Sequence, residues 1–178
     1  GASGSGKSSV VMAGLLPRLG AEHPDWTFLK RVVPGAHPLE SLANALASEI
    51  TGGMVPAIMR ELSSDGSMRA LHQFASQITE SRVVLFVDQF EELFRYHRGA
   101  ERDAAAFAAL LLGATTHPDV YVVITLRSEF LGDCALYPDL PEAINAGLFL
   151  TPSLTPEQMA DAIRAADLNR IVFDPAVL

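Results

Sequence analysis

The chain opens on a run of small residues and one cation whose spacing suits phosphate binding. Gly1-Ala2-Ser3-Gly4-Ser5-Gly6-Lys7-Ser8 matches the pattern G-x-x-x-x-G-K-[ST] at every fixed position. Glycines let successive backbone N–H groups turn toward a phosphate, and a helix that begins just after them points the positive end of its dipole at the same anion. Since a helical pattern follows at once, the run predicts a phosphate-binding loop rather than a flexible Gly/Ser-rich terminus.

The side chains of this loop have separate expected roles. Lys7 can neutralise the β- and γ-phosphate oxygens, the Ser8 hydroxyl can ligate Mg²⁺, and Ser9 is placed to meet the α-phosphate. The expected ligands are Mg²⁺ with ATP or GTP, because no base-reading motif such as N-K-x-D decides between the two nucleotides. The candidate nucleotide-binding residues are Gly1, Ser3, Gly4, Ser5, Gly6, Lys7, Ser8 and Ser9.

A carboxylate at the end of an apolar run is the second candidate element. Val83–Val87 is continuously hydrophobic, which is typical of a strand buried on both faces of a parallel sheet, and Asp88 follows it directly. Ligands of open α/β folds bind at the carboxyl edge of the sheet. We therefore expect Asp88 and Ser8 to hold the Mg²⁺ ion together.

Two further acids are candidates for catalysis. Glu91 and Glu92 lie three and four residues beyond Asp88. If a helix begins there, either carboxylate could reach a water in line with the γ-phosphate. The alternative is that they are acidic residues favoured at a helix N-terminus by the helix dipole. Both glutamates remain candidates.

Arg127 is the third catalytic candidate. It directly follows a second apolar run, Val120–Leu126. A guanidinium at this tip could sense the γ-phosphate, because its planar fork matches phosphate oxygens. The alternative is an ion pair with Glu129 or Asp88.

The elements that must position these residues alternate between strands and helices, which predicts an α/β fold. The expected class is a three-layer P-loop NTPase of the ASCE type around a parallel sheet. The expected strands are Trp26–Val33, Val83–Val87, Val120–Leu126 and a short Gly147–Leu150. The expected helices are Ser9–Leu19, ended by Pro17 and Gly20, then Leu39–Ile50, Pro56–Leu62, Met68–Thr79, Asp103–Leu112 and Thr155–Ala166, the last with Thr155 as N-cap and Gln158 three residues later. A phosphate loop normally leaves a central strand, so a first strand is expected upstream of Gly1.

These patterns predict how the chain divides into two regions and in which compartment the protein resides. Residues 1–152 are expected to form the NTPase core, truncated at its N-terminus, and residues 153–178 the start of a helical lid. The net charge of −8 gives no general basis for nucleic-acid binding. No apolar run approaches the roughly 20 residues that cross a bilayer. The single cysteine, Cys134, fits a reducing compartment, so a cytoplasmic protein is expected.

Four segments together resemble the novel STAND NTPases. They are Gly1–Ser9, Pro34-Gly35-x-x-Pro38, Val87-Asp88-Gln89-Phe90-Glu91-Glu92-Leu93-Phe94 and Thr125-Leu126-Arg127-Ser128-Glu129-Phe130-Leu131-Gly132-Asp133-Cys134. The family comprises signal-transducing ATPases, mostly bacterial, often fused to WD40 repeats or other sensor and effector modules. The D-x-x-E-E spacing is also similar to that of the NACHT branch. The resemblance runs from Gly1 to about Ala162, and Arg164–Asp174 lacks the Gly-Pro-type turn that the family's lid would have.

The resemblance implies a role for each candidate residue. Lys7 and Ser8 would bind the nucleotide and Mg²⁺, and Asp88 would be the Walker B acid. Glu91 or Glu92 would support hydrolysis, while Arg127 would act as a sensor. It also implies ATP rather than GTP as the nucleotide.

The leading hypothesis is a regulatory ATP switch that hydrolyses slowly. Its nucleotide state, ATP or ADP, would control closure or self-association. One alternative is an AAA+-like motor working in a ring, with Arg95, Arg98 or Arg102 as a finger that reaches a neighbour's site. Another is a scaffold whose nucleotide site is unused. A small-molecule kinase is disfavoured by the lack of an Arg-rich lid, and an ABC-type ATPase by the lack of an LSGGQ-like string.

Overall fold

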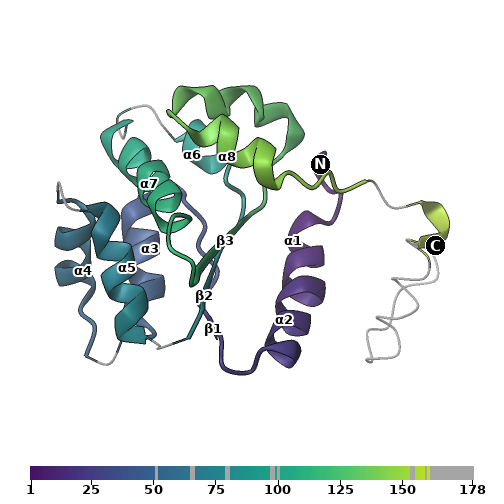
Figure 1. Cartoon of the computed structure of the whole chain (residues 1–178). Coiled ribbons are helices and arrows are strands. Elements are labelled where there is room, and N and C mark those ends of the chain that lie inside the picture. Colours follow the sequence, from purple (N-terminus) through teal and green to yellow (C-terminus); the bar gives the residue numbers. More distant parts are fainter. Residues whose placement is uncertain are drawn as a thin grey trace, which may run out of the picture.

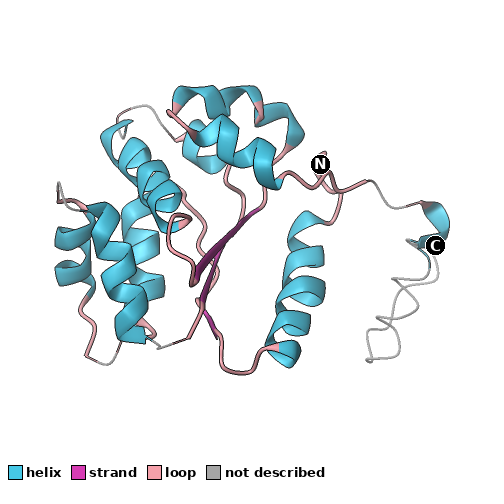
Figure 2. Cartoon of the chain, viewed as in Figure 1, coloured by secondary structure: helices cyan, strands magenta, loops and turns pink. Residues whose placement is uncertain are grey.

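The fold is built on a parallel three-stranded sheet in the order β1-β2-β3 (Figure 1). In this computed structural model the described residues are 1–50, 52–64, 67–78, 81–96, 99, 101–152, 155–158 and 160. The strands are β1 (Thr27–Phe28), β2 (Val83–Val87) and β3 (Val120–Ile124), with β2 paired to both neighbours. The strands shown in Figure 2 are separated by helical segments. This confirms the predicted α/β class and is compatible with an NTPase fold.

Helices lie on both sides of the sheet. Those of the first side are α3 (Pro38–Ala47), α4 (Val55–Leu62), α5 (Ser67–Ile78) and α7 (Glu101–Ala114). A single helical column covers the other side and consists of α1 (Lys7–Ser9), the π-helical η1 (Val10–Leu15) and α2 (Leu16–Glu22) (Figure 1). The short α6 (Glu92–Arg95), the 3₁₀ segments η2 (Ser128–Phe130) and η3 (Gly132–Leu136), and α8 (Leu140–Gly147) lie beyond the carboxyl ends of the strands.

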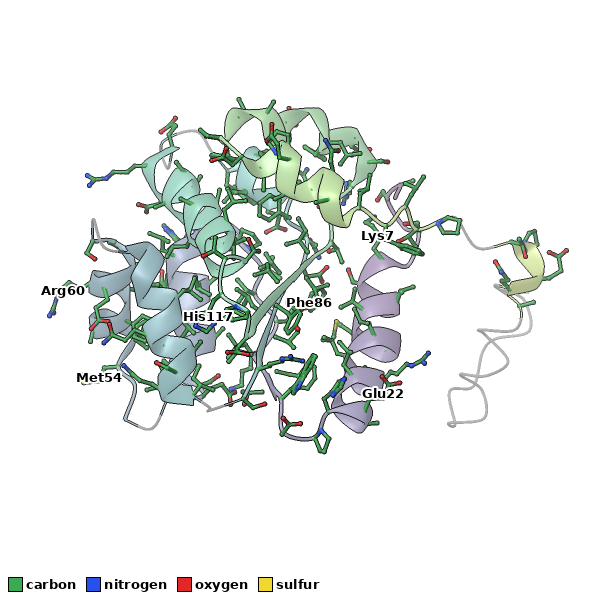
Figure 3. All side chains as sticks on the ribbon, in the orientation of Figure 1. Lys7, Glu22, Met54, Arg60, Phe86 and His117 are labelled. Carbon is green, nitrogen blue, oxygen red and sulfur yellow. The ribbon has the colours of Figure 1, made fainter. Side chains whose placement is uncertain are left out.

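β2 is the buried central strand that its sequence predicted. All five of its residues are buried. Val83, Leu85 and Val87 belong to the main hydrophobic core with α3, α4, α5 and α7. Since successive strand residues point to opposite faces, Val84 and Phe86 face the other side, where Phe86 lies between the sheet and the α1–α2 column (Figure 3). This placement directs the residue after β2, Asp88, to the carboxyl edge of the sheet.

The first helix does not end at Pro17 and Gly20, so that prediction was wrong. Helical structure continues to Glu22. Leu16 N–H donates to the carbonyl of Val11, five residues back, so the hydrogen-bond spacing changes next to Pro17, which has no N–H to place. Gly20 faces β1, because a Cβ there would lie 3.7 Å from the Phe28 ring. The proline and glycine therefore accommodate a π-helical segment and a close packing contact.

The predicted strand Gly147–Leu150 is also absent, and a helix precedes it instead. α8 includes Gly147, and residues 148–150 adopt no regular structure. Leu148, Phe149 and Leu150 are 53%, 78% and 64% exposed. The sequence did contain an overlooked signal for α8, because Asp139 occupies its N-cap position and a proline follows in the first turn.

The start of the last predicted helix is confirmed. Thr155 N–H donates to Gln158 Oε1 at 3.0 Å, and Gln158 N–H donates to Thr155 Oγ1 at 3.2 Å, which is a reciprocal capping box. Residues 156–158 are helical, while the remainder of the predicted lid lies almost entirely outside the described residues. No helix in the described part of the chain has the length and apolar character needed to span a membrane.

An aromatic cluster ties the segment after β2 to the segment after β3. Phe94 packs edge-on against Phe90 and is stacked near Phe130 and Tyr137. Cys134 lies in the same region, fully buried, and its thiol donates to the Phe130 carbonyl at 3.6 Å. Burial raises the pKa of this thiol, which fits a packing role. The cluster holds Glu91 and Arg127 near each other through the chain segments that carry them.

Candidate nucleotide-binding site

The loop at residues 1–8, which the sequence predicts to bind phosphate, depends on glycine at defined positions. Gly4 and Gly6 have φ angles of 72° and 77°, in the left-handed region that side chains with a Cβ rarely adopt. Gly1 is required for a different reason, because an added Cβ would lie 2.6 Å from the Thr151 carbonyl oxygen and 2.8 Å from Ser5 Oγ. The loop therefore curls tightly back toward residue 151 before the α1–α2 column begins.

The Lys7 ammonium lies inside this loop. Its Nζ donates to the carbonyl oxygens of Gly1 at 3.0 Å and Ala2 at 2.6 Å, and it is 3.5 Å from Ser5 Oγ. Ser5 is buried, whereas Ser3 and Ser9 are exposed. The Lys7 ammonium therefore donates to neutral carbonyl oxygens of the loop, and the same donors could instead bind the oxygens of a phosphate.

The structure brings Ser8 and Asp88 together although 80 positions separate them. Ser8 Oγ donates to Asp88 Oδ1 at 2.6 Å. Asp88 is completely buried, and its N–H donates to the Val32 carbonyl at 2.8 Å. The carboxylate is therefore fixed at the carboxyl edge of the sheet, directly beside the first turn of the helix that follows the phosphate loop.

Thr125 and Gln89 complete the surroundings of Asp88 Oδ1, and for neither residue was a contact with Asp88 predicted from the sequence. The Thr125 hydroxyl donates to this oxygen and accepts from Gln89 N–H at 3.0 Å, while the same N–H lies 3.1 Å from Oδ1. Gln89 has a φ of 53°, a left-handed conformation that turns the chain at this point. Thr125 could have been found from the sequence, because it is a polar residue directly after an apolar strand.

A second cation, Arg31, pairs with the other oxygen of Asp88. Its Nη1 lies 3.3 Å from Asp88 Oδ2 and 3.9 Å from the sulfur of Met12. Arg31 was not predicted from the sequence either. Its position depends on how β1 pairs with β2, which no local motif reveals.

Glu91 and Arg127 form an ion pair. Of the two partners suggested for Arg127 from the sequence, Glu129 and Asp88, only Glu129 contacts it. Arg127 Nε lies 2.9 Å from Glu91 Oε1, and Arg127 N–H donates to Glu91 Oε2 at 3.3 Å. A weaker contact of 3.7 Å joins Arg127 to Glu129, and Asp88 is not among its recorded partners. The next residue, Ser128, donates its N–H to the Gly1 carbonyl at 3.0 Å. The pair therefore lies next to the start of the phosphate loop.

The remaining candidates lie farther from these contacts. The Glu92 carboxylate lies beside Gly35, where an added Cβ would come 3.8 Å from its Oε2. Arg95 is an exposed residue at the end of α6, and Arg102 is exposed in the first turn of α7. Arg98 lies outside the described residues.

The donor atoms at Ser8 and Asp88 suit Mg²⁺. A hydroxyl and a carboxylate oxygen are hard ligands, and Mg²⁺ typically takes only one or two protein ligands together with waters and substrate phosphates. Within the described residues no group of three or more His, Cys, Asp or Glu side chains could hold a metal ion by itself. These residues therefore fit a metal held jointly with a nucleotide better than a closed metal cage.

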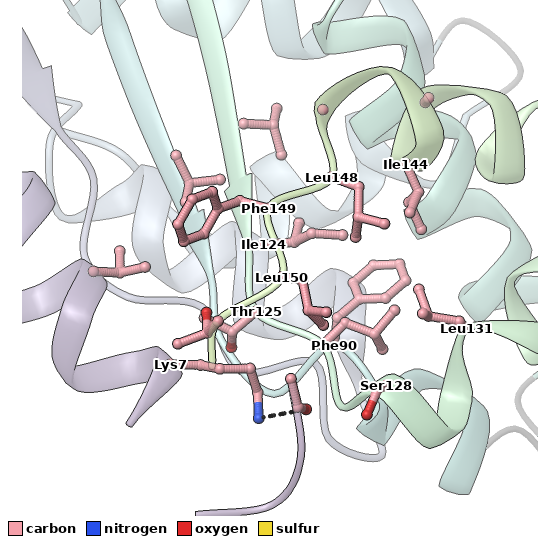
Figure 4. Close-up of a pocket in the computed structure, with 18 of the residues that line it drawn as sticks. Lys7, Phe90, Ile124, Thr125, Ser128, Leu131, Ile144, Leu148, Phe149 and Leu150 are labelled. Carbon is pink, nitrogen blue, oxygen red and sulfur yellow. Dashed lines mark hydrogen bonds between the residues drawn. The ribbon is translucent and has the colours of Figure 1, made fainter. Parts of the chain in front are cut away.

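A large apolar cavity extends away from this site along β3. Its volume is about 560 Å³. Lys7, Thr125 and Ser128 line one end, whereas most of its wall is apolar (Figure 4). Leu148, Phe149 and Leu150 lie along it. The hydrogen-bonding groups suited to phosphate lie at its rim, so the cavity and the phosphate loop are adjacent but distinct features.

We expect Gly6→Ala to lower the free energy of unfolding by about 1–2 kcal/mol, because alanine must adopt the left-handed conformation of this residue. The matched control is Gly14→Ala in η1, where a Cβ would meet no atom within 4 Å. That change should be stabilising by about 0.5–1 kcal/mol, since alanine is favoured over glycine in helices. Chemical denaturation measures both values, and equal effects of the two substitutions would contradict the assigned loop conformation.

A family model described as Novel STAND NTPase 1 matches residues 1–177, in agreement with the family predicted from the sequence motifs. No curated protein and no solved structure matches the chain.

Proposed function

The chain belongs to the novel STAND NTPase 1 family, and we propose that it binds ATP with Mg²⁺ and acts as a slowly hydrolysing switch. The family establishes a nucleotide-binding domain of a signalling NTPase. The finer proposal is carried by the contact between Ser8 Oγ and Asp88 Oδ1. That contact joins the phosphate loop to the carboxyl edge of β2, where Ser8 and Asp88 would hold a metal ion beside a bound triphosphate.

Each nearby side chain has a proposed role in binding. Lys7, which contacts loop carbonyls here, would transfer its donors to the β- and γ-phosphate oxygens. Ser8 and Asp88 would hold the Mg²⁺ ion, which when bound neutralises phosphate charge. The backbone amides of the loop would supply further donors to the phosphates.

The pair of Glu91 and Arg127 supports slow rather than rapid hydrolysis. Both carboxylate oxygens of Glu91 are engaged by Arg127, and only 3% of the residue is exposed. A general base must have a free oxygen within hydrogen-bond reach of the attacking water. We propose that the Arg127 guanidinium moves to the γ-phosphate of bound ATP and releases Oε1 of Glu91, so that activation of the water requires a rearrangement of this pair.

The proposed switch would act within a larger assembly. Fused sensor or effector modules such as WD40 repeats, and self-association that depends on the bound nucleotide, are proposals that rest on the family. The geometry adds one point, because the Glu91–Arg127 pair lies beside Gly1 and can respond to the contents of the phosphate loop.

We expect Glu91→Gln to lower single-turnover ATP hydrolysis about 100-fold or more while nucleotide binding is retained, the usual effect of losing a general base. The matched control is Glu92→Gln, an adjacent carboxylate that lies beside Gly35, and it should stay within a few-fold of wild type. Steady-state turnover of the wild type should be on the order of 10⁻³ s⁻¹, as in slow nucleotide switches, rather than the 1–100 s⁻¹ of kinases.

The outcomes of this experiment separate three cases. Rapid turnover would contradict the switch and favour a motor. Equal effects of the two glutamine substitutions would contradict the assignment of Glu91. A wild-type protein that does not bind ATP at all would leave the scaffold alternative standing.

A further inference from the structure

The segment that follows β1 continues to pair with β2, and it contains an extra residue relative to β2 just before the site. The N–H groups of Thr27, Leu29 and Val32 donate in turn to the carbonyls of Arg82, Val84 and Phe86. From the first of these hydrogen bonds to the second, the chain advances two residues on each side of the pairing. From the second to the third, it advances three residues from Leu29 to Val32 but only two residues along β2. The register agrees, since Phe28 pairs with Val84 and Val32 pairs with Val87. The segment 29–32 is therefore a β-bulge, a feature that redirects side chains and is frequent near functional sites.

The bulge places two cations next to each other on the exposed side. Leu29 and Val32 are buried, whereas Lys30 and Arg31 between them are exposed. In a regular strand, neighbouring side chains would point to opposite faces. Of the two cations, Arg31 is the one that contacts Asp88. The next residue, Val32, fixes the segment against the start of the site, because its carbonyl accepts from Asp88 N–H at 2.8 Å.

The two oxygens of Asp88 have unequal surroundings. Oδ1 accepts from the hydroxyls of Ser8 and Thr125 and from Gln89 N–H. Oδ2 has one recorded partner in the described part of the chain, Arg31 Nη1 at 3.3 Å. The Arg31 side chain is 47% exposed, and Asp88 is completely buried. Oδ2 is thus the oxygen that a cation could reach by replacing a single, exposed partner.

We propose that Arg31 is a resident counter-ion that competes with a divalent cation for Oδ2 of Asp88. This inference rests on the proposed function, in which Asp88 holds Mg²⁺. A guanidinium at this oxygen neutralises the buried carboxylate and repels a metal ion that arrives without phosphate. A metal that arrives with a nucleotide brings phosphate ligands, and the same phosphates offer the displaced guanidinium a new partner. Arg31 therefore couples metal binding to nucleotide binding.

The test measures Mn²⁺ binding by electron paramagnetic resonance in the full-length protein, first without nucleotide and then with saturating ADP. Arg31→Gln should bind Mn²⁺ alone about tenfold more tightly than wild type, since a like charge next to the site is removed. With ADP the difference should shrink or reverse. Lys30→Gln removes the same charge from the neighbouring residue and should stay within about twofold of wild type.

Two further variants, Arg31→Lys and Asp88→Asn, separate competition by Arg31 from other causes of a change in Mn²⁺ affinity. Arg31→Lys retains the charge and should stay close to wild type, which excludes a general effect of altering the bulge. If Arg31→Gln bound Mn²⁺ no more tightly than Lys30→Gln, while Asp88→Asn abolished binding, the competition would be refuted and the metal site would stand. If Asp88→Asn left Mn²⁺ binding unchanged, both the competition and the proposed metal site would be refuted.

Discussion

Replacing Lys7 by alanine is expected to weaken the binding of Mg·ATP by about 10- to 100-fold, which corresponds to the loss of about 1.5–3 kcal/mol from hydrogen bonds to a charged group. The structure shows that the Lys7 ammonium can make several contacts inside the loop at once, with the carbonyls of Gly1 and Ala2 and with Ser5. Phosphate oxygens would replace these neutral acceptors with charged ones, and alanine offers neither. Titration calorimetry with ATP or a fluorescent analogue measures the change.

Lys30 provides a matched control for Lys7, because these two are the only lysines in the sequence. Lys30 is exposed in the bulge at residues 29–32 and carries the same charge. Lys30→Ala should change the affinity by no more than about twofold, as expected for a screened surface charge. A Lys7→Ala protein that bound Mg·ATP with wild-type affinity would refute the proposed phosphate loop, provided that its unfolding free energy were close to that of wild type.

The features predicted correctly from the sequence depend on short-range patterns. The continuous apolar run Val83–Val87 indicated a strand buried on both faces, and it is one. The proximity of Ser8 and Asp88 followed from the rule that ligands bind at the carboxyl edge of a parallel sheet. These inferences needed only the positions of residues within a strand or a loop, because the fold class fixed how those elements meet.

The contacts that were missed depend on the register between strands. Thr125 reaches Asp88 because β3 pairs with β2 so that Val87 lies opposite Ile124. Arg31 reaches the same carboxylate from the bulge at residues 29–32, where the chain has one extra residue relative to β2. A shift of one residue moves a side chain to the opposite face of a strand. The sequence contained a partial signal, since two adjacent cations between Leu29 and Val32 break the alternation of a regular strand, but it did not specify which of them would face Asp88.

The predicted strand Gly147–Leu150 was wrong for a related reason. An apolar segment becomes a strand only where it has a partner for its backbone N–H and C=O groups. The described part of the chain pairs β3 only with β2, and residues 148–150 line the same cavity as β3 with largely exposed side chains. β3 itself is buried at Val120 but half-exposed from Val122 to Ile124. The second edge of β3 and the segment 148–150 therefore face the same apolar space.

We expect a strand upstream of Gly1 to fill this space, parallel to β3. The Gly1 carbonyl already accepts from Ser128 N–H, just beyond the end of β3, so a chain that enters Gly1 along β3 would run in the same direction as that strand. The cavity of about 560 Å³ has Gly1 and Lys7 at one end and apolar residues along its length. Such a strand would also give residues 148–150 a neighbour to pair with.

Adding about a dozen native upstream residues to residues 1–178 should therefore raise the free energy of unfolding by about 3 kcal/mol or more, because each newly buried Val- or Leu-sized side chain contributes about 1.5–3 kcal/mol. The extension should also raise solubility and tighten ATP binding, since it anchors the amides of the phosphate loop. Denaturant unfolding, binding of a hydrophobic dye and ATP titration measure these effects. The control is an extension of the same length in which the apolar residues are replaced by serine. If the short chain, the native extension and the serine extension were equally stable and bound ATP equally well, the cavity would not be the place of a strand, and the loop would need no anchor beyond its own helix.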